Sequence, residues 1–157
     1  MHNAVVARFR ECVPAGLDLC SLRVVESRQE SLALRKGVLE PPSIVSERGA
    51  MVTVHAGGGL GYAATTDLSA SGLGRAIERA RTWAERTGRV SVIDTRGLPR
   101  ARQMGRWRTP ATRPWADVGM AERLAWLHDT AAAVPTDDRI VHHAVELAGI
   151  HLSLIHI

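Results

Sequence analysis

The sequence predicts an α+β fold in which an antiparallel sheet packs against two main helices. Alternating apolar and polar residues in the first half predict strands with one buried face, because strand side chains point alternately to opposite sides. A glycine triplet predicts a tight hairpin, and two later segments place apolar residues at helical spacing. At 157 residues the chain is long enough to bury a core without disulfides or metal.

The first half predicts a short helix followed by strands. The helix lies within residues 5–13, where apolar residues have helical spacing and Pro14 follows as a stop signal. Lys36-Gly37 predicts a turn, and 57–59 supplies the positive φ angles of a hairpin. Four antiparallel strands are predicted, at 19–29, 31–35, 51–56 and 60–66, with a turn at Glu30 before the second. Residues 38–39 could continue the pairing until Pro41-Pro42 ends it.

Residues 69–87 predict the first main helix. Asp67, Ser69 and Ser71 are all competent N-cap residues. Apolar residues, several of them alanine, recur at helical spacing, so the helix can lie close to the sheet. Gly88 is expected to follow the helix as its C′ residue.

The second half predicts a long connection, a second main helix and a further strand. Residues 89–115 are rich in proline and arginine and lack sustained periodicity. A loop of this length is usually functional or mobile. Asp117 is expected to cap a helix over 118–134, and 139–147 alternate as a strand.

Composition favours a cytoplasmic protein. Cys12 and Cys20 have neither a CxxC nor a metal-ligand spacing, so free thiols in a reducing compartment are expected. Charges interrupt the N-terminal apolar run too early for a signal peptide, and no later apolar run would span a bilayer. The net charge is +4, carried by nineteen arginines and one lysine, a skew that a GC-rich genome explains as well as phosphate binding does.

The last six residues, 152–157, resemble the translation of an adaptor used in sequencing libraries. A segment encoded by an adaptor is not native, so we exclude residues 152–157 from the predicted fold. The predicted domain therefore spans 1–151, and we expect it to be the front part of a longer protein. The true C-terminus of the gene stays open.

One stretch carries a family resemblance. Gly-Gly-Gly-Leu-Gly-Tyr-Ala-Ala-Thr-Thr-Asp-Leu-Ser, followed by a helix beginning Gly-Leu-Gly-Arg-Ala-Ile-Glu-Arg-Ala, occupies 57–69 and 72–80. In this order it resembles the N-terminal domain of the TldD/PmbA family, also called modulators of DNA gyrase. The order of the other predicted elements agrees, so the resemblance covers roughly 17–147.

The resemblance implies a cytoplasmic zinc metallopeptidase that acts on peptides or unfolded proteins and pairs with a similar subunit. The family's catalytic subunit carries a His-Glu-x-x-x-His helix, in which two histidines hold zinc and the glutamate activates water. This sequence contains no such motif. We therefore predict no catalytic, cofactor-binding or metal-binding residue here, expect zinc in a later domain, and expect this chain alone to be inactive.

Two patterns resemble binding motifs but fail their context tests. His142-His143-Ala-Val-Glu146 is the nearest approach to a metal site, yet on a strand His143 would point away from the other two side chains. Gly59-Leu-Gly61-Tyr-Ala-Ala64 matches G-x-G-x-x-A, but a dinucleotide site requires a helix that starts on the glycines. A surface strand and a hairpin are the better interpretations.

The arginine-rich connection offers the alternative from another functional class. Arginines from Arg96 to Arg113, with Trp107 among them, could follow phosphates while the indole stacks on a base. The connection could instead be a solvated loop that docks on an acidic surface of the missing domain or of the partner subunit. Nucleic acid is the less favoured partner, because arginine is enriched throughout the chain. A domain of the family's non-catalytic partner subunit is the third possibility, and the sequence does not separate it from the catalytic one.

Overall fold

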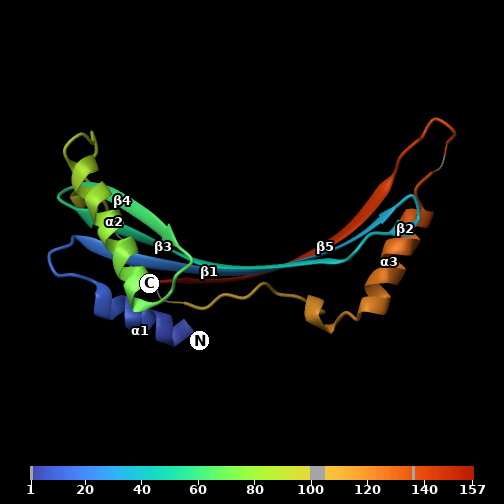
Figure 1. Ribbon diagram of the computed structural model, residues 1–157, viewed down its shortest axis with the longest axis horizontal. Coiled ribbons are helices and arrows are strands. Elements are labelled where there is room, and N and C mark those ends of the chain that lie inside the picture. Colours follow the sequence, from blue (N-terminus) through green and yellow to red (C-terminus); the bar gives the residue numbers. More distant parts are fainter. Residues whose placement is uncertain (1, 100–104, 136) are drawn as a thin grey trace. The chain divides into compact units, whose positions relative to one another are not determined.

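The computed structural model describes residues 2–99, 105–135 and 137–157. Its helices and strands form an α+β fold with an antiparallel sheet, as the sequence predicts (Figure 1). The chain divides into two compact units: unit 1 comprises 1–26, 47–103 and 152–157, and unit 2 comprises 27–46 and 104–151. In chain order the elements are α1 (His2–Cys12), β1 (Leu19–Arg35), β2 (Val38–Leu39), β3 (Ser43–Ala56), β4 (Gly59–Thr65), α2 (Ala70–Gly88), the 3-10 turns η1 (Thr95–Gly97) and η2 (Trp115–Asp117), α3 (Met120–Ala132) and β5 (Ala144–His156).

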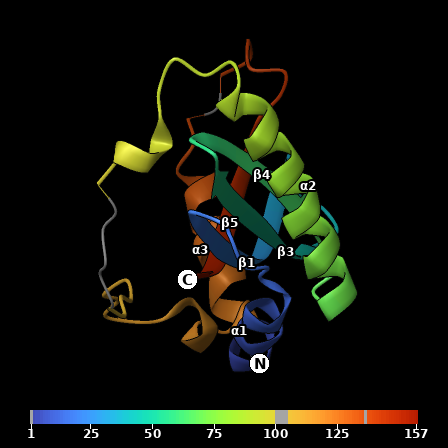
Figure 2. The same ribbon diagram turned by 90° about the vertical axis from the view of Figure 1, so that its left-hand side faces the viewer.

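Unit 1 contains the larger core. Alternate residues of its strands face α2, which runs along β4 (Figure 2). The helix contributes Leu73 and Ile77, which are 0% and 1% exposed, and several buried alanines. The fully or nearly buried apolar residues of this core are Val5, Phe9, Leu22, Val24, Ala50, Val52, Val54, Ala56, Ala63, Leu73, Ala76, Ile77, Ala80 and Ala84.

The hairpin between β3 and β4 follows the predicted glycine triplet. Gly57 and Gly58 have φ angles of 57° and 81°, and Ala56 pairs directly with Gly59. Two consecutive positive φ angles define the two-residue turn whose twist matches that of a β-hairpin. The glycines therefore make a hairpin, and the dinucleotide interpretation of this segment is not supported.

Glycines also bring β4 and α2 into backbone contact. A Cβ atom at Gly59 or Gly61 would collide with the carbonyl oxygen of Ala84 or Ala80 in α2. Gly88 lies opposite Gly57 and Gly59 and is the last residue of the helix, and Arg89 follows in the right-handed helical region. The expectation that Gly88 is a C′ residue is therefore wrong. Its small size serves packing against the hairpin.

Unit 2 has a small apolar core between α3 and the strands. Lys36 and Gly37, with φ angles of 50° and 77°, form the predicted turn between β1 and β2. In β5, alternate side chains are partly buried. The buried residues are Leu32, Leu34 and Leu127, and Leu124, Ala131, Val145 and Leu147 pack against them.

Several sequence-based boundaries need correction. β1 is one continuous strand, so the predicted turn at Glu30 is wrong. Asp117 lies in η2, and α3 begins after Gly119 without a side-chain cap. β5 begins at Ala144 and continues through 152–156, so the segment excluded from the prediction is a strand. Isolated strand residues give no local signal for where pairing starts and stops, because the partner strand determines it.

The end of the described chain pairs with β1. The amide of Ile157 donates to the carbonyl of Leu22, and the amide of Leu22 donates back, at 2.9 and 3.0 Å. The proposed limit of the native domain at residue 151 stays a prediction. Of the helices described, none is both long enough and apolar enough to cross a bilayer.

Candidate functional site

The edge strand β4 presents backbone hydrogen-bonding groups that its own sheet does not use. Among the described residues, β4 pairs only with β3. In an antiparallel pair, every second residue exchanges hydrogen bonds with the neighbouring strand, and the residues between direct their N–H and C=O outward. The pair Ala56–Gly59 closes the two-residue turn, so Leu60, Tyr62 and Ala64 are the outward residues.

Only part of this edge is accessible. The Thr87 hydroxyl accepts a hydrogen bond from the Leu60 amide at 3.0 Å and lies 2.8 Å from the Leu60 carbonyl oxygen, to which it donates. Tyr62 is 66% exposed, and Ala64 is also exposed. Among the described residues, the outward backbone groups without a hydrogen-bond partner are therefore those of Tyr62 and Ala64, and we call these two residues the open edge.

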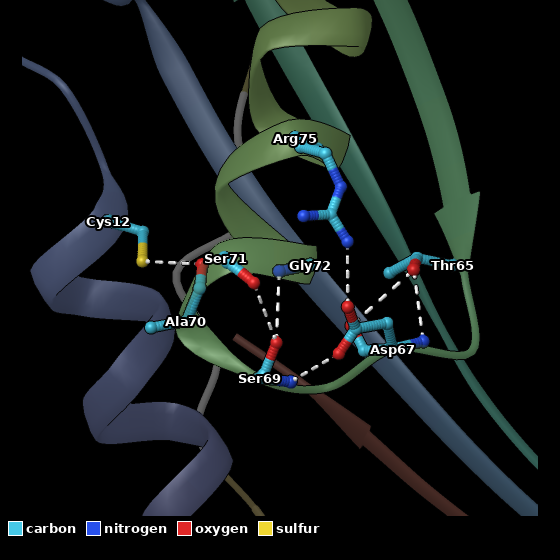
Figure 3. Close-up of polar contacts among 8 residues, drawn as sticks. All are labelled: Cys12, Thr65, Asp67, Ser69, Ala70, Ser71, Gly72 and Arg75. Atoms are coloured by element: carbon cyan, nitrogen blue, oxygen red, sulfur yellow. Dashed lines mark hydrogen bonds and ion pairs between the residues drawn. The ribbon is translucent and has the colours of Figure 1, made fainter.

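A polar network at the start of α2 fixes the helix beside this edge (Figure 3). Ser69 caps the helix and accepts a hydrogen bond from the Gly72 amide at 3.1 Å. Asp67 accepts from the Ser69 amide at 3.0 Å and pairs with Arg75 at 2.8 Å. The hydrogen bonds from Ser69, reinforced by the Arg75 charge, lower the pKa of Asp67. Of the three predicted caps, Ser69 is the one used.

The thiols take no part in a disulfide. Cys12 and Cys20 are free, as predicted. The Cys12 thiol donates to the Ala70 carbonyl at 3.3 Å and so ties α1 to the start of α2 (Figure 3). Burial raises the pKa of the Cys20 thiol to about 11. Cys20 is therefore protonated at neutral pH and unsuited to nucleophilic chemistry.

Unit 2 contains a partly buried charged cluster that sequence reasoning missed. The Glu30 carboxylate accepts a hydrogen bond from the Trp115 indole at 3.0 Å and from Arg123 Nη1 at 2.6 Å. Arg123 is 8% exposed, its Nη2 donates to the Trp115 carbonyl at 2.7 Å, and its guanidinium lies 4.2 Å from the indole ring centroid. The Trp115 hydrogen bond, followed by that of Arg28, lowers the pKa of Glu30.

A signal for this cluster was present in the sequence. Glu30 lies two and four residues before Leu32 and Leu34. In a continuous strand it therefore faces the same side as these buried residues. The predicted turn at Glu30 concealed this alternation. Arg123 and Trp115 are distant in sequence, and nothing local pairs them with Glu30.

The predicted histidine segment does not assemble a metal site. His142 is exposed, and His143 precedes β5 and offers its backbone carbonyl to the Lys36 amide at 3.2 Å. The Glu146 carboxylate accepts a hydrogen bond from the Ser31 hydroxyl at 2.6 Å. Within the described residues, no three His, Cys, Asp or Glu side chains gather around a common point.

Two described arginines of the arginine-rich connection form local ion pairs. Arg96 pairs with Asp94 at 2.6 Å, and Arg113 pairs with Glu122 at 2.6 Å. Arg96 lowers the pKa of Asp94 to about 2 through its side-chain hydrogen bond. Arg106, Trp107 and Arg108 are exposed, whereas Arg100 and Arg102 lie outside the described residues.

One segment of the chain matches a known family model. Residues 20–84 match the family model described as PmbA/TldA metallopeptidase domain 1. This match confirms the resemblance to the TldD/PmbA family. No curated protein matches the chain.

Solved structures share the fold over the whole chain at low identity. They include a proposed modulator of a DNA gyrase from Thermotoga maritima (TM-score 0.67, 18% identity, 99% of this chain and 34% of that one). A second proposed modulator of DNA gyrase, from Bacteroides thetaiotaomicron, has a TM-score of 0.65 and 13% identity over 99% of this chain and 36% of that one. TldE from Thermococcus kodakarensis has a TM-score of 0.58 and 15% identity over 99% and 34%. The chain thus spans about a third of the length of these proteins.

Proposed function

From the match of residues 20–84 to the first domain of the PmbA/TldA metallopeptidases, we propose that this chain is the first domain of a TldD/PmbA-type zinc metallopeptidase. In this proposal the domain supports the cleft in which peptides or unfolded proteins bind. The observation that carries it is the open edge of β4, where the backbone groups of Tyr62 and Ala64 face outward. A flat strand edge recognises main chain, which every unfolded substrate offers.

The proposed zinc and the catalytic groups lie outside the described residues. A catalytic zinc needs three protein ligands and an open position for water. The described His, Cys, Asp and Glu side chains form no such set, so they do not fit a zinc site. Cys20 has a raised pKa, which also disfavours the thiolate that zinc binds. In this proposal the role of this chain is binding and support.

The substrate would bind as an added strand. An extended segment can exchange a pair of hydrogen bonds with Tyr62 and another with Ala64. Each hydrogen bond contributes about 1 kcal/mol net, so two residues alone give weak binding. Weak main-chain binding suits an enzyme that must accept many sequences and release its products.

A family-type subunit is the proposed protein partner. The similarity to TldE and to the proposed gyrase modulators supports a pairing of related subunits. A catalytic subunit and a non-catalytic partner remain equal candidates for the parent of this chain. Nucleic acid binding through Arg96–Arg113 is not favoured, because Arg96 and Arg113 already hold Asp94 and Glu122.

Amide hydrogen exchange tests the binding role. We expect a permanently unfolded polypeptide, such as a reduced and carboxymethylated protein, to slow exchange at Tyr62 and Ala64. The Val54 amide, on the paired strand and fully buried, is the internal control and should not change. Unchanged exchange at the open edge under saturating polypeptide would overturn strand addition.

The coding sequence tests the enzymatic part of the proposal. We expect the uninterrupted gene to continue beyond codon 151 and to encode either His-Glu-x-x-x-His or a related domain without it. The first outcome assigns the chain to a catalytic subunit and the second to a partner subunit. A reading frame that ends at residue 157 would contradict both.

A further inference from the structure

One stripe of α2 borders the outer side of β4. Thr87 hydrogen-bonds both backbone groups of Leu60. Trp83 precedes Thr87 by one helical turn and therefore lies on the same stripe. Its Cβ is 2.9 Å from the position that a Cβ atom of Gly61 would take. The stripe thus closes the edge at Leu60 and flanks it beside Gly61.

We propose that Thr87 and Trp83 set the register of a strand added to β4. Thr87 stops the added strand before Leu60, and Trp83 receives the one side chain of that strand that lies opposite Gly61. This inference rests on the proposed strand addition and specifies its position and its side-chain preference. The occupant is an extended peptide segment with an apolar residue at that position.

The stop at Leu60 follows from hydrogen-bond satisfaction. To pair with Leu60, an added strand must displace the Thr87 hydroxyl, which also lies 3.0 Å from the Ala84 carbonyl. The exchange gains no net hydrogen bond for the Leu60 groups and leaves the hydroxyl to find another partner. At Tyr62 and Ala64 an added strand meets no such competitor. The favoured register therefore ends one residue pair before Leu60.

The preference at Trp83 follows from the pleat. Residues opposite each other on paired strands point to the same face, and Gly61 faces α2. Gly61 has no side chain, so the peptide residue opposite it points toward the helix beside Trp83. Trp83 is 54% exposed, and the Arg86 guanidinium lies 5.5 Å from its ring centroid. An apolar side chain of the size of valine there gains contact with the indole, whereas alanine at the same position gains little.

The test combines Thr87→Val with residue-resolved amide exchange on the full chain. The probe is a soluble extended peptide of alternating threonine and valine flanked by lysines. In the wild type we expect the peptide to slow Tyr62 and Ala64 and to leave Leu60 unchanged. In Thr87→Val, Leu60 should exchange faster without peptide and become protected when peptide is added. Thr82→Val is the matched control, because the Thr82 hydroxyl donates to Glu78 within the helix at 2.9 Å. It should behave as the wild type.

The outcomes separate the two proposals. Protection of Tyr62 and Ala64 with no gain at Leu60 in Thr87→Val would overturn the register stop and leave strand addition standing. Absence of protection at both residues in all variants would overturn strand addition and the register stop together. Protection of the open edge that rises with protein concentration and without peptide would identify a second copy of the chain as the occupant and overturn the proposal.

A second measurement isolates Trp83. Replacing Trp83 with alanine should weaken binding of the valine peptide by about twofold to fivefold, as cross-strand pairs typically contribute. A peptide with alanine opposite Gly61 should bind the wild type more weakly than the valine peptide, because it lacks the contact with the indole. It should bind Trp83→Ala and the wild type nearly equally. Equal binding of both peptides to the wild type would overturn the side-chain preference.

Discussion

The interiors of units 1 and 2 are stabilised by different interactions. Within the described chain, the core of unit 1 contains fourteen buried apolar residues, and that of unit 2 contains three. Unit 2 adds the cluster of Glu30, Trp115 and Arg123, whose ion pair spans 2.6 Å with side chains only 18% and 10% exposed. An apolar core is insensitive to pH, whereas a buried ion pair depends on the charge of both partners. The comparison predicts different responses to mutation and acid.

The largest expected effect is a charge in the core of unit 1. Ile77→Asp places a carboxylate at a position that is 1% exposed. We expect a destabilisation of more than about 4 kcal/mol, enough to unfold unit 1. Near-UV circular dichroism and amide exchange measure the loss. Glu78→Gln, at the exposed neighbouring position, is the control, and a folded Ile77→Asp protein would contradict the assigned core.

The next effect concerns the backbone contact between β4 and α2. Gly61→Ala adds a methyl group that collides with the Ala80 carbonyl, so the helix must shift. We expect a loss of about 3 kcal/mol in chemical denaturation. Gly74→Ala is the matched control, because a Cβ there meets open space within α2. That variant should gain up to about 1 kcal/mol, and equal effects at both glycines would refute the close approach.

A smaller effect, confined to unit 2, is expected from its charged cluster. Arg123→Met keeps the volume and leaves the partly buried Glu30 carboxylate with Arg28 as its remaining ion-pair partner. We expect the thermal midpoint to fall by a few degrees and amide protection to decrease in unit 2 before unit 1. Arg139→Gln breaks an exposed pair with Asp137 and should change neither quantity. Loss of protection that begins in unit 1 would contradict the assignment.

The pH dependence sharpens the same comparison. The pKa of Glu30 is lowered in the folded state, chiefly by the Trp115 hydrogen bond, from an ordinary value of 4.5. Its contribution to stability is therefore present above pH 4.5 and is lost as the pH falls through the lowered folded pKa. The stability difference between wild type and Glu30→Gln should shrink on acidification over this range. A difference that stays constant between pH 6 and pH 3, roughly the range that brackets a carboxyl titration, would exclude this role.

The smallest effect is the loss of a helix cap. Ser69→Ala removes the acceptor for the Gly72 amide at the start of α2. We expect a loss of about 1 kcal/mol in the free energy of unfolding. Ser91→Ala, which removes only local hydrogen bonds to the carbonyl and amide of Ile93, is the control. No difference between the two variants would indicate that Asp67 alone fixes the helix start.

What the sequence could predict follows from where the determining interactions lie. The hairpin at Gly57-Gly58 and the helix from Ser69 depend on φ angles and caps within a few residues, and both predictions are confirmed. The continuity of β1 and the start of β5 depend on partner strands far along the chain, and these predictions are wrong. Glu30 and Arg123 belong to the second kind, because 93 residues separate them.

The glycine contact between β4 and α2 has a consequence for how such domains diverge. Apolar side chains in a core can exchange for one another as long as volume is kept. A position where two main chains touch admits only hydrogen as its side chain, so substitution of the glycine is disfavoured there. Gly59 and Gly61 are such positions, and both lie within the matched residues 20–84. In distant members of this fold, glycines at these contact positions should therefore be retained after the surrounding sequence has diverged.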